Sequence, residues 1–184
     1  KCIKSWEKHC PDYQIVEWNE SNFDITVVPY TKEAYTMGKF AFVSDYVRLH
    51  VLYNFGGIYV DTDLEIRKNI DRYLIFKAFS SFEDGKHIPT AIMGAERYHQ
   101  WIKKLLDYYE NKSFVNHLGE MDLTPNTKII TDISVFEDGL VQNNNYQVIN
   151  DDVHIFPKEY FCINLFDDIN YSVHHFNGSW KSDH

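Results

Sequence analysis

The chain has 184 residues, of which 44% are hydrophobic and 24% are charged, the balance of a soluble globular protein with one sizeable core. Its formal net charge of −9 argues against a nucleic-acid partner, because backbone phosphates have to be met by a surplus of Lys and Arg. If so acidic a protein handles a diphosphate, it needs a cation or a local cluster of donors to offset the repulsion.

Three cysteines, Cys2, Cys10 and Cys162, show neither a CxxC pair nor the spacing of zinc ligands. We interpret them as small buried hydrophobic residues of a protein in a reducing compartment. No apolar run approaches the roughly 18 residues that a membrane span needs. We therefore expect a cytoplasmic protein, at most attached peripherally to the inner face of the cell membrane.

The first third of the chain carries the clearest local patterns. Residues 1–10 are predicted to end a helix before Pro11, and the alternation in residues 13–18 predicts a strand. Apolar residues recur at helical spacing over residues 40–55, and Gly56 and Gly57 end that helix because glycine adopts the left-handed conformation readily. Residues 58–60, Ile-Tyr-Val, then predict a short buried strand.

The rest of the chain alternates between strand and helix patterns. Further strands are predicted at residues 78–82, 90–94, 146–149, 153–156 and 171–176, and helices at residues 98–111 and 128–136. Because strands and helices interleave, we expect an α/β sandwich with a mostly parallel sheet. No repeat, low-complexity segment or linker divides the chain, which predicts a single domain over residues 1–184.

Two carboxylates follow the strand at residues 58–60. Asp61 and Asp63 are two positions apart, so both side chains can converge on one point just beyond the sheet edge, where ligands bind in open α/β sheets. Oxygen-rich sites of this kind suit Mg²⁺ or Mn²⁺, with substrate phosphates filling the remaining coordination positions. The alternative is that Asp-Thr-Asp is merely a polar turn.

A second pair of charged residues lies on the helix that leads into this strand. Asp45 and Arg48 are three apart and therefore share a helix face. If that face lies behind the site, Arg48 can offer planar donors to phosphate or sugar hydroxyls, and Asp45 can accept from sugar hydroxyls. The alternative is a surface ion pair that contributes only about 0.2–0.5 kcal/mol.

The segment of residues 44–63 strongly resembles the sugar-binding region with the DXD motif of glycosyltransferase family 32, which includes yeast-type α-1,6-mannosyltransferases and bacterial capsule and lipopolysaccharide transferases. The shared pattern is S-D-x-x-R-x-x-x-L-x-x-x-G-G-x-Y-x-D-x-D, and large clostridial glucosylating toxins share this core. The resemblance implies a GT-A-like, Rossmann-type α/β/α sandwich. It also implies that Asp45 and Arg48 contact the donor sugar and phosphates, that Tyr59 lies against the nucleotide, and that Asp63 binds the metal directly. Asp61 would bind ribose, sugar or metal-bound water.

The carboxyl-terminal segment His174-His175-Phe176-Asn177-Gly178-Ser179-Trp180 is similar to the end of such transferase cores. There a metal-binding His precedes a Gly and a Trp beside the diphosphate, so the resemblance places Ser179 and Trp180 at the donor. Because a strand turns successive side chains to opposite faces, only one of the two histidines can bind the metal. The spacing His-Phe-x-Gly favours His175, whose neutral imidazole suits Mn²⁺.

The resemblance covers nearly the whole chain. Residues 92–95 and 155–161 are similar to the A-I-x-G-A and Y-P-x-x-Y-F segments of the family. A first strand of the type I-P-K-x-I-H-x-x-W, which carries part of the base pocket, is expected to be missing, and the domain is therefore expected to be truncated at its amino terminus.

The function that these observations predict is transfer of a hexose, with retention of configuration, from a UDP- or GDP-sugar to a glycan or lipid-linked glycan acceptor, in surface polysaccharide biosynthesis. The divalent cation offsets charge that develops on the leaving diphosphate. One alternative is a non-catalytic module that binds nucleotide-sugars or glycans. Another is a haloacid-dehalogenase phosphotransferase, but that class places Thr or Val where this chain has Glu65, and it lacks the Gly-Gly turn.

Overall fold

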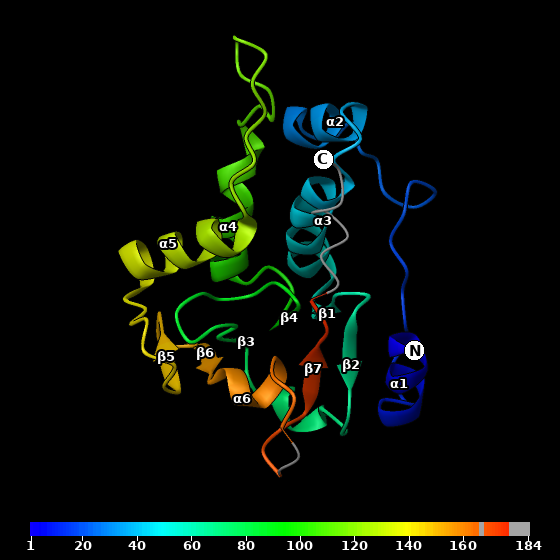
Figure 1. Ribbon diagram of the computed structural model, residues 1–184, viewed down its shortest axis with the longest axis vertical. Coiled ribbons are helices and arrows are strands. Elements are labelled where there is room, and N and C mark those ends of the chain that lie inside the picture. Colours follow the sequence, from blue (N-terminus) through cyan, green and yellow to red (C-terminus); the bar gives the residue numbers. More distant parts are fainter. Residues whose placement is uncertain (166–167, 177–184) are drawn as a thin grey trace.

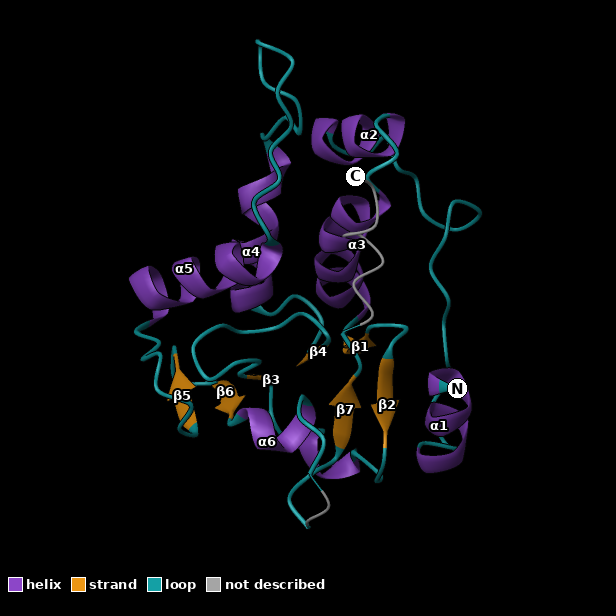
Figure 2. Ribbon diagram, viewed as in Figure 1, coloured by secondary structure: helices purple, strands orange, loops and turns teal. Residues whose placement is uncertain are grey.

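The computed structural model of the chain describes residues 1–165 and 168–176. Helices α3 and α4 lie on one side of a central sheet, and α6 lies on the other side (Figures 1 and 2). The helices are α1 (Cys2–His9), α2 (Pro29–Thr36), α3 (Phe40–Phe55), α4 (Gln100–Glu110), α5 (Asn126–Asp138), α6 (Lys158–Phe161) and the 3₁₀ helix η1 (Asp71–Tyr73). The strands are β1 (Gly57–Val60), β2 (Leu64–Ile66), β3 (Ala78–Ser81), β4 (Ile92–Ala95), β5 (Gln147–Ile149), β6 (Val153–Phe156) and β7 (Ser172–His174).

The central sheet is mixed. Its five strands run in the order β1-β4-β3-β6-β5, with β3 and β6 parallel and the pairs β1–β4, β4–β3 and β6–β5 antiparallel. The predicted α/β class is confirmed, and the described topology does not conflict with a GT-A-like arrangement. Parallel pairing is less extensive than expected, because β4 lies between β1 and β3 and runs against both, and because a short turn joins β5 to β6.

A second, two-stranded sheet brings the end of the chain back to the strand that follows the Asp61–Asp63 turn. Strand β7 pairs antiparallel with β2, and the register places His174 opposite Leu64 and Val173 opposite Glu65. These residues are more than a hundred positions apart in the sequence, yet they lie side by side, with α1 on the outer side of β2 (Figure 1). The predicted return of the final strand is confirmed.

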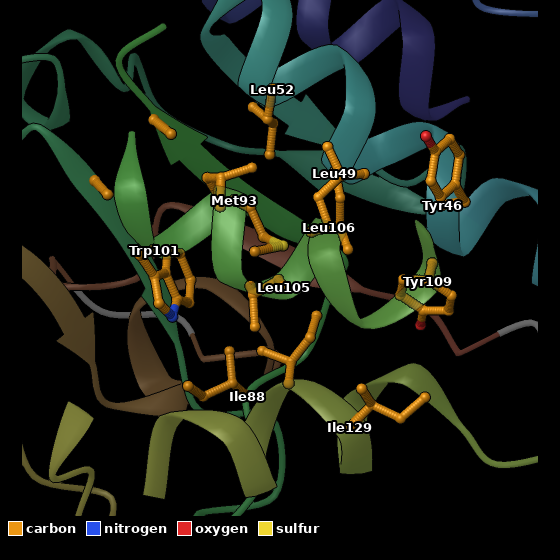
Figure 3. Close-up of a cluster of buried hydrophobic side chains, with 14 of the residues drawn as sticks. Tyr46, Leu49, Leu52, Ile88, Met93, Trp101, Leu105, Leu106, Tyr109 and Ile129 are labelled. Carbon is orange, nitrogen blue, oxygen red and sulfur yellow. The ribbon is translucent and has the colours of Figure 1, made fainter. Parts of the chain in front are cut away.

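Helix α3 is held by the main hydrophobic core. Its residues Leu49 and Leu52 pack with Trp101 and Leu105 of α4, all fully or almost fully buried (Figure 3). Complete burial of a leucine side chain contributes about 1.5–3 kcal/mol. The predicted helix at residues 40–55 is confirmed, and its packing against α4 makes it a rigid support for the polar residues it carries.

The link from α3 to β1 requires glycine. Gly56 ends the helix with a φ of 70°, and its N–H donates to the carbonyl of Leu52 at 2.9 Å. A Cβ on Gly56 would lie 2.8 Å from the backbone nitrogen of Arg97, closer than atoms pack. Both the conformation and the lack of space therefore exclude other residues, and the chain passes directly from α3 into β1.

Some predictions were wrong. Residues 13–18 are extended but pair with no strand among the described residues, and Ile15 and Val16 are 43% and 50% exposed. Alternation predicts a strand only where a neighbour supplies hydrogen bonds, and that information is not local. Helix α2, which begins with Pro29 at its first turn, and the short elements β2 and α6 were not predicted. None of the described helices is long and apolar enough to cross a membrane.

Candidate functional site

A tight turn after β1 carries the two carboxylates. The N–H of Asp61 donates to the carbonyl of Ala91 on the neighbouring segment at 2.9 Å, and the carbonyl of Asp61 accepts from the N–H of Leu64 at 2.9 Å. These bonds fix the backbone on both sides of Thr62. Because both ends of the turn are held, the side chains of Asp61 and Asp63 stay at the edge of the sheet, about one-fifth exposed each.

His174 completes a group of three potential metal ligands. One ligand atom each of Asp61, Asp63 and His174 lies within 4.8 Å of the others, and the imidazole Nε2 of His174 is 3.2 Å from Oδ1 of Asp63. Two carboxylate oxygens and an imidazole nitrogen form a donor set that suits Mn²⁺ and is compatible with Mg²⁺. The residues present therefore fit the divalent cation that the sequence predicts.

The choice of His175 as the third ligand was wrong. Its Nε2 lies 2.8 Å from Oε2 of Glu65, on the other face of the two-stranded sheet. The register explains this position, because Val173 pairs with Glu65 and His175 shares the face of Val173. Hydrogen bonds from Lys1 and His175 lower the pKa of Glu65. His175 therefore belongs to a surface ion-pair cluster, and His174 faces the carboxylates.

Replacement of His174 with alanine should weaken Mn²⁺ binding to the chain by roughly tenfold, because it removes one of the three ligands. The matched control is His175→Ala, which should change the Mn²⁺ dissociation constant less than twofold. Calorimetric titration of the purified proteins with Mn²⁺ measures both values. Equal effects of the two substitutions, or a larger effect at His175, would contradict the assignment of His174.

Arg48 joins Asp45 to Asp61 inside the protein. Its Nη2 lies 3.2 Å from Oδ1 of Asp45, and its Nη1 lies 3.2 Å from Oδ1 of Asp61. The guanidinium also donates to the carbonyl and hydroxyl oxygens of Ser44 and to the carbonyl of Thr90, each at 3.1 Å. All three guanidinium nitrogens of Arg48 therefore have protein acceptors, and the residue is only 5% exposed.

This geometry changes the expected part of Arg48. A buried guanidinium whose nitrogens contact the protein is placed to orient the two carboxylates, and a direct contact with donor phosphates would require it to give up one of these partners. Burial disfavours its charged form, but the neighbouring Asp61, Tyr59 and Asp45 outweigh this effect and raise the pKa of Arg48. The surface-ion-pair alternative for Asp45 and Arg48 is excluded by their burial.

Asp45 is 8% exposed, and burial raises its pKa to about 7, against the opposing effect of Arg48. Its Oδ1 also accepts a hydrogen bond from Nδ2 of Asn126 at 2.6 Å. Burial therefore favours the neutral form of this carboxyl group, whereas the positive charge of Arg48 favours the ionised form.

Tyr59 is hydrogen-bonded to Asp61 and helps to orient its carboxylate. Its hydroxyl donates to Oδ1 of Asp61 at 2.9 Å, and the guanidinium of Arg48 lies 4.9 Å from the centre of its ring. Arg48 thus lies over one face of the ring, and the expected contact of Tyr59 with the nucleotide stays a prediction. Ser179 and Trp180, the other predicted donor contacts, lie outside the described residues.

Sequence reasoning missed three polar residues that hold this site together. Ser44 belongs to the Ser-Asp pair of the motif and could have been found there. Thr90 and Asn126 come from segments far along the chain, before β4 and at the start of α5, and the residues around them give no pattern that points to a site.

Comparison with known proteins finds similarity in the part of the chain that carries the D-x-D turn. Residues 1–80 match the family described as "Glycosyltransferase sugar-binding region containing DXD motif", a stretch that includes Asp45, Arg48, Asp61 and Asp63 but not His174. Inositol phosphoceramide mannosyltransferase 3 of Schizosaccharomyces pombe is 26% identical over 111 residues, which cover 58% of this chain and 31% of that relative. The chain thus corresponds to about a third of the relative's length. No solved structure matches the chain.

The matched stretch includes the D-x-D turn. The structure brings the two carboxylates of this turn together with His174. The first 80 of the 184 residues therefore resemble the DXD-containing sugar-binding region of this glycosyltransferase family.

Proposed function

We propose that this chain is the GT-A-type catalytic domain of a glycosyltransferase that moves a hexose from a nucleotide diphosphate sugar to a glycan or lipid-linked glycan acceptor, in surface polysaccharide biosynthesis. The observation that carries the proposal is the meeting of Asp61 and Asp63 with His174 from the far end of the chain. An acidic protein needs such a cation site to hold a diphosphate.

Asp61, Asp63 and His174 would hold Mn²⁺ or Mg²⁺ in this proposal. Bound there, the cation would act as a Lewis acid that stabilises negative charge on the leaving diphosphate. The carboxylate of Asp61 is oriented for this task, because Tyr59 and Arg48 both engage its Oδ1. Its Oδ2 accepts no hydrogen bond from the described residues and is the oxygen available to a ligand.

The protein side of the reaction consists of orientation and charge. Arg48 lies between Asp45 and Asp61, and we propose that Asp45 contacts the donor sugar next to the diphosphate. Its carboxylate can accept a hydrogen bond from a sugar hydroxyl. The family resemblance implies retention, and no carboxylate stands out as a covalent nucleophile, so we propose attack by the acceptor hydroxyl on the face from which the diphosphate leaves.

The relative is named an inositol phosphoceramide mannosyltransferase, and we therefore place mannose first among the candidate hexoses. The direct test incubates the chain with GDP-mannose, UDP-glucose and UDP-galactose, with Mn²⁺ or with excess chelator, and measures release of the nucleoside diphosphate. Release that depends on Mn²⁺ supports the transferase.

Tight binding of a nucleotide-sugar without any turnover would favour the alternative of a non-catalytic binding module. If a folded chain neither binds nor cleaves any of these donors, the proposal is wrong. Thermal melting of the same sample shows whether the chain is folded.

A further inference from the structure

A buried polar bridge connects α5 to the donor side of the site. Asn126, the first residue of α5, is 7% exposed, and its Nδ2 lies 2.6 Å from Oδ1 of Asp45 and 3.1 Å from Oγ1 of Thr90. Thr90 is 5% exposed, and its carbonyl accepts from Nη1 of Arg48 at 3.1 Å. Thr90 thus contacts both Asn126 and Arg48. These two side chains also contact the same oxygen of Asp45.

The side chain of Asn126 is not used to cap its own helix. The N-cap of α5 is Pro125, and it makes no side-chain hydrogen bond to the helix. Both amide hydrogens of Asn126 are instead directed to Asp45 and Thr90. A polar residue this deeply buried is unfavourable unless its hydrogen bonds are made, so its position depends on these two partners.

The two contacts leave one oxygen of Asp45 open. Asn126 and Arg48 both engage Oδ1, at 2.6 and 3.2 Å. Oδ2 accepts no hydrogen bond from the residues that the structure describes, and the side chain of Asp45 is 12% exposed. Two donors on one oxygen fix the rotation of the carboxyl plane, and thereby the direction in which Oδ2 points.

We propose that Asn126 is a positioning residue for donor selection: by holding Oδ1 of Asp45, it presents Oδ2 to a hydroxyl group of the sugar. This inference rests on the proposed function, because it assigns the recognition of the sugar, as distinct from the nucleoside diphosphate, to the Thr90–Asn126–Asp45 bridge. Asp61, Asp63 and His174 would hold the cation that binds the diphosphate, and this binding would not depend on Asn126.

The test compares two ligands on the same protein in the presence of Mn²⁺. Calorimetry gives the dissociation constants of GDP and GDP-mannose, and of UDP and UDP-glucose, for the wild-type chain, for Asn126→Leu and for the neighbouring control Thr127→Val. Leucine is similar in size to asparagine but cannot donate. The hydroxyl of Thr127 makes no hydrogen bond to the described part of the chain.

We expect Asn126→Leu to raise the dissociation constant of the nucleotide-sugar about tenfold, the effect of losing one charge-assisted hydrogen bond. The dissociation constant of the nucleoside diphosphate should change less than twofold, and Thr127→Val should change neither. A substitution that merely loosened the fold would weaken both ligands alike, and that result would overturn the inference, as would unchanged binding of both.

A double-mutant cycle tests whether Asn126 acts through Asp45. In an Asp45→Ala background, Asn126→Leu should have no further effect on binding of the nucleotide-sugar. A further tenfold loss there would show that Asn126 contacts the ligand directly and would overturn the positioning role. If the folded wild-type chain binds none of the four ligands, the proposed function itself fails, a result that is distinct from either of these.

Discussion

Replacement of Asp63 with asparagine should lower Mn²⁺-dependent turnover of the donor by roughly a hundredfold or more, which corresponds to about 2.7 kcal/mol of transition-state stabilisation. Asp63 is the carboxylate that His174 faces, and its side chain is 19% exposed at the mouth of the site. Asparagine keeps the shape but removes the charge, so the cation that offsets charge on the diphosphate is held less firmly.

The fold should tolerate this substitution. The backbone carbonyl of Asp63 accepts from the N–H of His175 at 3.1 Å, and this contact does not change with the side chain. The Oδ1 of an asparagine can still accept a hydrogen bond from Nε2 of His174, which lies 3.2 Å from Oδ1 of Asp63. We therefore expect a Tm within about 3 °C of the wild type. Glu65→Gln is the matched control, since Glu65 lies two positions further along and faces His175, and it should retain activity. Full activity of Asp63→Asn, or of the wild type in excess chelator, would remove the metal from the proposal.

Replacement of Arg48 with lysine should lower turnover of the donor by roughly ten- to a hundredfold and destabilise the chain by about 2–4 kcal/mol. The guanidinium contacts Asp45 and Asp61 at the same time, each at 3.2 Å, from two different nitrogens. An ammonium group is a single point and cannot span both carboxylates while keeping the contacts to Ser44 and Thr90. One of the two carboxylates then loses its contact with a cation, and the guanidinium no longer orients Asp61 against Asp45.

Stability and activity have to be measured separately for this variant. Urea denaturation gives the free energy of unfolding, and initial rates are compared well below the Tm of the variant so that unfolded protein does not contribute. The control is Arg72→Lys, because Arg72 is exposed and pairs with the hydroxyl of Tyr171, and such surface changes usually remain within about 0.5 kcal/mol. Wild-type kinetics and stability for Arg48→Lys would show that the bridge between the carboxylates has no function.

Much of the site could be predicted because its residues are close in the sequence. Helix α3, the Gly56 turn and β1 follow from local periodicity and from the conformational freedom of glycine, and the structure confirms all three. Once these elements are in place, Asp45 and Arg48 lie on the buried side of the helix and Asp61 directly follows the strand. The motif of residues 44–63 thus contains both the elements and the polar groups that they carry.

The residues that come from other parts of the chain could not be found in this way. Asn126 begins a helix whose start was predicted at residue 128, and Thr90 precedes a strand that begins at Ile92. Their contacts with Asp45 and Arg48 span 81 and 42 positions. Because no local pattern encodes contacts of that separation, only the packing of α5 and β4 against α3 reveals them.

The sequence by itself determined that a carboxylate pair follows a short strand and that a histidine near the end of the chain is available to it. The strand, β1, was predicted to be buried but lies at the edge of the sheet and is only partly buried. Which histidine reaches the carboxylates was decided by the tertiary structure. Adjacent strand residues face opposite sides, so the choice between His174 and His175 depends on the register of β7 against β2, with Val173 opposite Glu65. That register is set by hydrogen bonds to a strand more than a hundred residues earlier, and a shift of one position would exchange the two side chains.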